Sequence, residues 1–297
     1  MSQNEQKLLQ RIAQLEAEVK NREEDLATYR RELSQANERL QNLMASLSRD
    51  LKVAAKIQRV LLPTEFPNIG GFEFSSKFVA SAIQGGDYLD IFEHEDKMKF
   101  GVLISAATGF GMSSLLLSAI LKFSGQIEAR RGAKPEKVLA MLADEVLEDA
   151  GEADLADLFY MIVDRRSYTM TYCSAGENLA LVQSYGTGEL TLLKPQQGGL
   201  STEGPRKFES SSVSLNPKDR LILCSRGAIE VKNLENESFG QERLFNALVS
   251  APKTGVHDVR NHLLFEIKKF LSGREPTRDV TVLVAEVKDR VIKLATT

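Results

Sequence analysis

The sequence is poor in the residues that bind zinc or form disulfides, with two cysteines and three histidines among its 297 residues. Cys173 and Cys224 lie in short apolar segments typical of strands and have no CxxC spacing, so we expect small buried hydrophobes in a reducing compartment. His94, His257 and His262 show no ligand spacing with either cysteine. These absences argue against a zinc site.

The chain also lacks long apolar runs and a marked excess of either charge. No stretch reaches the roughly 18 apolar residues of a membrane span, and the polar N-terminus has no signal-peptide core. The net charge is -3, which gives no attraction to nucleic acid or to anionic membranes. We therefore expect a cytoplasmic protein, with one globular domain of about 200–250 residues and an extension.

Glycine and proline are absent from the first 62 residues, and Pro63 ends this stretch. A heptad repeat runs through it, and broken d positions occur at Arg22 and Asp50. A 3.5-residue repeat with charged flanks predicts a coiled coil over residues 1–62. We expect this coil to form a homodimer, although the repeat does not define the number or the direction of its strands. The alternative is a solvated helix folded against its own domain. The a positions are all apolar: Ile12, Val19, Leu26, Leu33, Leu40, Leu47, Ala54 and Leu61.

Residues 63–297 change character, because turn residues now separate short apolar runs. Strands are predicted at 72–80, 158–164, 169–175, 179–184, 190–193, near Val213, at 220–224 and at 280–287, with a hairpin over 92–104 whose second strand begins at Lys99. Amphipathic helices are predicted at 112–130, 135–149, 241–250 and 257–271. Two groups of strands with helix pairs early and late predict an α+β fold, a four-layer sandwich of two sheets covered by helices.

Two polar motifs stand out within this domain. Gln84–Asp90 contains Gly85-Gly86-Asp87 and is predicted as an acidic turn after the first strand. Ala106 follows Asp87 by nineteen positions and precedes the glycine turn Thr108–Gly111. An acidic turn that faces a glycine turn is typical of a metal or phosphate site. Here the second turn carries no carboxylate.

Taken together, the motifs resemble those of a known family, the bacterial metal-dependent serine/threonine phosphatases of the PPM type, in their stage II sporulation protein E branch. The resemblance covers about residues 53–287 and implies an αββα phosphatase fold. Its members dephosphorylate STAS-domain antagonists of anti-sigma factors. The matching motifs, in the family's order, are Ala55–Gln58 with Leu61–Pro63, Gly85–Tyr88 with Asp90, Thr108–Gly111, Ala175–Asn178, Ser225–Gly227 with Glu230 and Phe239–Leu244, and Arg278–Thr281.

The departures from the family concern its metal ligands. The family binds two Mg²⁺ or Mn²⁺ ions with aspartates at four of these places, and the resemblance maps these places to Asp87, Ala106, Arg226 and Arg278. Hard divalent ions need oxygen ligands, alanine offers none, and arginine is a protonated donor without an acceptor. We therefore expect no bound metal, no other cofactor and no catalytic residues of the family type.

Two interpretations of these positions remain open. In the favoured one, Asp87 is a salt-bridge partner of Arg226 or Arg278. In the other, Asp87, Ala106, Arg226 and Arg278 form a cationic pocket that holds an anion, such as a phosphoserine of a partner. Replacement ligands are also conceivable at Asp90, Asp279 or Glu177, although Asp90 and Asp279 are expected to be structural or solvent-exposed.

Three functions compete on this basis. The first is a pseudophosphatase, a dimeric signalling protein that binds a STAS-domain or other signalling partner in a partner-switching or sigma-factor pathway. The second is an active, divergent metal-dependent phosphatase of phosphoserine or phosphothreonine proteins. The third is a structural oligomeriser in which the coiled coil is the functional part.

Overall fold

A computed structural model describes residues 3–61, 66–81, 86–107, 129–147, 156–194, 198–201, 204, 207–252 and 254–288. The chain divides into two compact units, Met1–Val53 and Ala54–Thr297. The predicted domain boundary at residue 62 stays a prediction, because helix α1 (Gln3–Leu61) runs through the division between the units. Within the described ranges, no helix combines the length and the apolar character needed to cross a bilayer.

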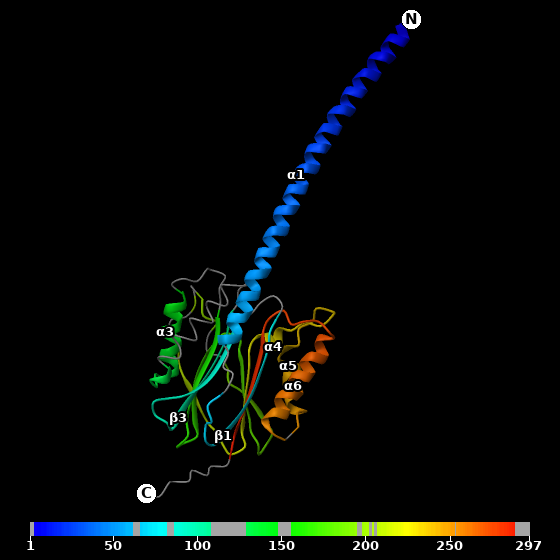
Figure 1. Ribbon diagram of the computed structural model, residues 1–297. Coiled ribbons are helices and arrows are strands. Elements are labelled where there is room, and N and C mark those ends of the chain that lie inside the picture. Colours follow the sequence, from blue (N-terminus) through cyan, green and yellow to red (C-terminus); the bar gives the residue numbers. More distant parts are fainter. Residues whose placement is uncertain are drawn as a thin grey trace. The chain divides into compact units, whose positions relative to one another are not determined.

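Helix α1 confirms the predicted long N-terminal helix and is continuous over 59 residues (Figure 1). Its apolar heptad positions form an exposed stripe, in which each side chain is between 45% and 66% exposed. Pairing of this stripe with a second chain stays a prediction. The exposed stripe consists of Ile12, Leu15, Val19, Leu26, Tyr29, Leu33, Leu40 and Leu43.

The second unit contains two five-stranded antiparallel sheets (Figure 1). The first has the order β1-β10-β9-β6-β7, and the second has the order β2-β3-β4-β5-β8. The strands are β1 (Phe72–Val79), β2 (Asp87–Glu93), β3 (Lys99–Ala107), β4 (Ala156–Asp164), β5 (Thr169–Ala175), β6 (Leu179–Gln183), β7 (Leu190–Leu192), β8 (Ser211–Ser214), β9 (Arg220–Cys224) and β10 (Val280–Val287).

Helices cover the outer face of each sheet, which confirms the predicted four-layer α+β sandwich. Helix α3 (Pro135–Leu147) packs on β4 and β5 through Val138, Leu139 and Leu142. On the other sheet lie α4 (Gly227–Glu230), α5 (Gly240–Val249) and α6 (Val256–Leu271). Helices α3, α5 and α6 each bury one apolar face, as the sequence periodicity predicted.

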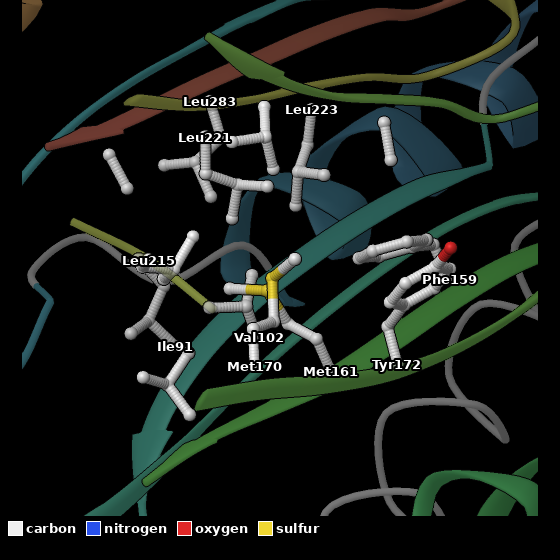
Figure 2. Packing of buried hydrophobic residues seen from close by; sticks show 14 of the residues in the cluster. Ile91, Val102, Phe159, Met161, Met170, Tyr172, Leu215, Leu221, Leu223 and Leu283 are labelled. Atoms are coloured by element: carbon white, nitrogen blue, oxygen red, sulfur yellow. The ribbon is translucent and has the colours of Figure 1, made fainter. Parts of the chain in front are cut away.

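The main core lies between the two sheets. Figure 2 shows Ile91, Val102, Met161 and Met170 of one sheet opposite Leu221, Leu223 and Leu283 of the other. Side chains alternate between the two faces of a strand, so every second residue of β2, β3, β4, β9 and β10 enters this layer. The same alternation brings polar side chains into this layer at one end of the sandwich.

The structure corrects two predictions of secondary structure. Strand β2 begins at Asp87, five residues before the predicted hairpin strand at Phe92, so Asp87–Asp90 belong to a strand and not to a turn. The reason is that both faces of β2 are buried, which removes the polar–apolar alternation of a half-exposed strand. Helix α4 was not predicted, because four residues are too short to show a helical period. Most of the predicted helix 112–130 and the glycine turn Thr108–Gly111 lie outside the described residues.

Candidate functional site

The inter-sheet layer becomes polar at one end of the sandwich. In sheet register, Asp87 of β2 lies opposite Ala106 of β3, and Ala106 lies opposite Asp157 of β4. Partners in adjacent antiparallel strands share a face, so these three residues form one row, continuous with Leu89, Ile104 and Phe159 of the core. From the other sheet, buried Asn178, Ser225 and Thr281 extend the same layer.

Asp87 is buried and is held by a hydroxyl group. The Thr281 Oγ1 donates a hydrogen bond of 2.7 Å to Asp87 Oδ2. Burial is the main cause that raises the pKa of Asp87 well above its ordinary value, and the negative charges of Asp279 and Asp157 raise it further. Hydrogen bonds from Ser225 and Thr281 act in the opposite direction and lower the pKa. The surroundings of Asp87 thus disfavour its charged form relative to that of an exposed aspartate.

The predicted salt bridge of Asp87 with Arg226 or Arg278 is wrong. Among the described residues, Asp87 has no arginine within ion-pair distance, because both guanidinium groups pair with other carboxylates. Arg226 Nε lies 2.6 Å from Glu230 Oε1, and Arg278 Nε lies 2.8 Å from Glu230 Oε2. Glu230 thus bridges the two arginines, each of whose side chains is less than a third exposed.

Asp157 is the second carboxylate of the row, and sequence reasoning missed it. Its Oδ2 lies 3.8 Å from Arg226 Nη1, and the residue is 1% exposed. Burial raises the pKa of Asp157 to about 6, against the opposing effects of the Glu177 backbone N–H and the Arg226 charge. The signal in the sequence was an acidic residue immediately before the predicted strand at 158–164, but it belongs to none of the matching motifs.

The absence of a side chain at Gly176 allows the turn after β5 to pack closely against Asp157. Gly176 has a φ of +86°, and a Cβ there would lie 1.9 Å from Asp157 Oδ1 and 2.9 Å from the Asp157 Cα. The next residue, Glu177, is 60% exposed at its side chain and lies 3.3 Å from Arg226 Nε. Asn178 follows: its Oδ1 accepts from the Arg226 backbone N–H at 3.1 Å, and its Nδ2 donates to the Ile104 carbonyl at 3.3 Å.

Asp279 and Asp90, the two aspartates considered as replacement ligands, accept hydrogen bonds from backbone N–H groups. Asp279 Oδ1 accepts from the Ser81 N–H at 2.8 Å, and Oδ2 accepts from Gly86 N–H at 3.0 Å and Asp87 N–H at 3.5 Å. Asp90 lies three residues from Asp87 and therefore on the opposite face of β2, where its Oδ1 accepts from the Ile91 N–H at 2.9 Å. Asp90 and Asp279 are both buried, which confirms that they are structural residues and contradicts the alternative that they are solvent-exposed.

The histidines and cysteines are dispersed. His94 Nε2 lies 3.3 Å from the Tyr160 hydroxyl, His257 Nδ1 lies 2.7 Å from Ser75 Oγ, and His262 Nε2 lies 3.2 Å from Ser250 Oγ. Both cysteines are buried and free, as predicted. In the part of the chain that the structure describes, no group of three or more histidine, cysteine, aspartate or glutamate side chains is placed to hold a metal ion.

Comparisons with known proteins give a consistent relationship. The sequence profile of the family described as Stage II sporulation protein E (SpoIIE) matches residues 96–288. Phosphoserine phosphatase RsbP of Bacillus subtilis is 25% identical over 256 residues, which are 84% of this chain and 60% of RsbP. Phosphoserine phosphatase RsbU of Bacillus subtilis is 21% identical over 198 residues, or 67% of this chain and 58% of RsbU. The chain thus spans about three-fifths of the length of these relatives.

Solved structures share the fold. The SiaA-PP2C domain of Pseudomonas aeruginosa has a TM-score of 0.68 at 16% identity, over 82% of this chain and 98% of that domain. The phosphatase domain of SpoIIE from Bacillus subtilis, with a fragment of its regulatory domain, has a TM-score of 0.61 at 15% identity, over 73% of this chain and 63% of that one. At these identities the likeness extends to the arrangement of sheets and helices.

Proposed function

The chain belongs to the stage II sporulation protein E family of PPM-type phosphatases, and from this premise we propose that it is a pseudophosphatase that acts by binding protein partners. One observation carries the proposal. Ala106 lies directly between Asp87 and Asp157 in sheet register, while Arg226 and Arg278 are held together by Glu230 where the family's other two aspartates are expected.

The remaining carboxylates are poorly suited to a pair of divalent ions. Asp279 uses both oxygens on backbone N–H groups, and Asp87 accepts a short hydrogen bond from Thr281. Asp157 and Glu177 face the guanidinium group of Arg226. A metal-dependent phosphatase needs metal-bound oxygen as nucleophile and cations that clamp the phosphoryl group. The donor set present favours neither, so we propose that the chain holds no catalytic metal and no other cofactor.

The partner class follows from the family resemblance. RsbP and RsbU are named phosphoserine phosphatases, and the family resemblance implies STAS-domain proteins as partners. A domain that keeps the fold but not the chemistry can retain a partner-binding surface. We propose that this chain binds a STAS-domain or related signalling protein in a partner-switching pathway, without hydrolysing it.

The direct test is hydrolysis. In millimolar Mn²⁺, the full chain is expected to release phosphate from a phosphoserine-bearing STAS-domain protein no faster than buffer, while RsbU of Bacillus subtilis serves as the active control. Mn²⁺-dependent release that disappears in Asp87→Asn would instead establish the second candidate, an active divergent phosphatase. That candidate has one supporting observation, since Asp87 and Asp157 face the same layer.

The exposed stripe of α1 supports the dimeric part of the proposal. Apolar side chains this exposed over several heptads are stabilised when a second helix covers them. The double variant Leu26→Glu/Leu33→Glu places charges in the stripe and is expected to convert a dimer to a monomer of 33.0 kDa by light scattering after gel filtration. The matched control, Asn21→Glu/Gln35→Glu, adds the same charge off the stripe and should stay dimeric. A wild-type monomer at micromolar concentration would contradict the pairing.

A further inference from the structure

The ion pairs around Arg226 connect segments that are far apart in the sequence. Asp157 begins β4 in one sheet, and Glu177 lies in the turn from β5 to β6. In the other sheet, Arg226 directly precedes α4 after β9, Glu230 is the last residue of α4, and Arg278 precedes β10. The network therefore crosses from one sheet to the other at the polar end of the sandwich.

Each contact is close enough to matter energetically. Glu230 contacts both guanidinium groups, at 2.6 Å and 2.8 Å, and Arg226 also reaches Glu177 at 3.3 Å and Asp157 at 3.8 Å. A carboxylate as buried as Asp157 is costly without a nearby positive charge. Arg226 supplies a positive charge on this side of the row, and Ala106, the register partner of Asp157, is uncharged.

We propose that Arg226 and Arg278, joined through Glu230, are the permanent cations of this site and stabilise the polar end of the sandwich without a divalent ion. Arginine is always protonated, so its charge cannot dissociate as a metal ion can. The inference rests on the proposed lack of a catalytic metal, but it concerns stability, and its test does not measure hydrolysis.

The test compares thermal unfolding of the full chain in EDTA and in millimolar Mn²⁺. A ligand that binds the native state raises the melting temperature, so the wild-type chain is expected to change by less than about 1 °C between the two conditions. Arg226→Gln removes the charge and keeps most of the side chain. It is expected to lower the melting temperature in EDTA by about 5 °C or more, because it leaves Asp157 unpaired and Glu230 with one partner.

Arg166→Gln is the matched control. Arg166 pairs with Asp96 through both terminal nitrogens at 3.0 Å and lies 3.6 Å from Asp164, but the Arg166 and Asp96 side chains are 41% exposed or more, so solvent screens these pairs and they contribute little. Its melting temperature should lie within about 2 °C of wild type. If Arg226→Gln behaves like Arg166→Gln, or if Mn²⁺ stabilises the wild-type chain by several degrees, the inference is wrong.

The outcomes separate this inference from the proposed function. Stabilisation by Mn²⁺ without hydrolysis would overturn the inference and leave the pseudophosphatase standing. Hydrolysis together with a strong destabilisation by Arg226→Gln, and with no stabilisation by Mn²⁺, would overturn the pseudophosphatase and leave the stabilising role of the arginines standing.

Discussion

Replacing Ala106, Arg226 and Arg278 together by aspartate is expected to give a domain that binds Mn²⁺ at least about 100-fold more tightly than the wild-type chain, because affinity for hard cations rises with the number of carboxylate ligands. The substitution removes two positive charges and adds three negative ones around Asp87 and Asp157. Isothermal calorimetry with Mn²⁺ measures the change. The same titration with Mg²⁺ shows whether the site accepts the smaller ion.

The control for this variant is Asp87→Asn in the triple background. If the new site includes the row of β2, β3 and β4, the loss of the Asp87 charge should weaken Mn²⁺ binding by about tenfold or more. A folded triple variant that does not bind Mn²⁺ would show that positions 87, 106, 226 and 278 do not surround a common metal site. Circular dichroism in EDTA and in Mn²⁺ distinguishes that outcome from a failure to fold, and folding that requires Mn²⁺ would support the expected result.

Gly227→Ala is expected to destabilise the domain by about 3 kcal/mol, lowering the melting temperature by about 6–12 °C. A Cβ at Gly227 would lie 1.9 Å from the Asp279 carbonyl oxygen and 3.3 Å from the Arg278 Cβ. This carbonyl oxygen belongs to the backbone of Asp279, whose side chain accepts hydrogen bonds from the Ser81 and Gly86 N–H groups. Moving the carbonyl aside would therefore disturb these hydrogen bonds. Differential scanning calorimetry gives the measurement.

Gly186→Ala is the matched control, since a Cβ at Gly186 meets no atom within 4 Å. Its effect should stay within about 0.5 kcal/mol. Equal melting temperatures for the two alanine variants would mean that α4 does not approach the start of β10 as closely as the structure places it.

The sequence predicted best the elements whose pattern is local. Strands β5, β9 and β10 have the predicted bounds, because each is an apolar or β-branched run between turn residues. Helix α5 differs from the prediction by one residue at each terminus, and α6 differs by one residue at its start. Strand β2 failed at its start, because Asp87 and Asp90 are buried polar residues, and only the packing of both faces shows that they belong to the sheet.

The sequence did not predict the contacts of the candidate site, and the assignment of its residues to a functional site stays a prediction. The family resemblance placed Asp87 and Ala106 in one site, and the register of β2 and β3 brings them opposite each other. Glu230 lies four residues after Arg226 and reaches it through α4, a helix that the sequence did not predict. Asp157 belongs to the other sheet and reaches Arg226 only when the two sheets pack together. The charge of the residues at positions 87, 106, 226 and 278 therefore does not describe the site completely, because Asp157, Glu177 and Glu230 also contribute.

The bridge that Glu230 makes between Arg226 and Arg278 also couples the effects of substitutions at these two positions. Replacing one arginine alone by aspartate would place a second carboxylate beside Glu230 and leave only one guanidinium group to balance both. The energetic effects of changes at the two arginines are therefore expected to be non-additive, because each effect depends on which residue occupies the other position.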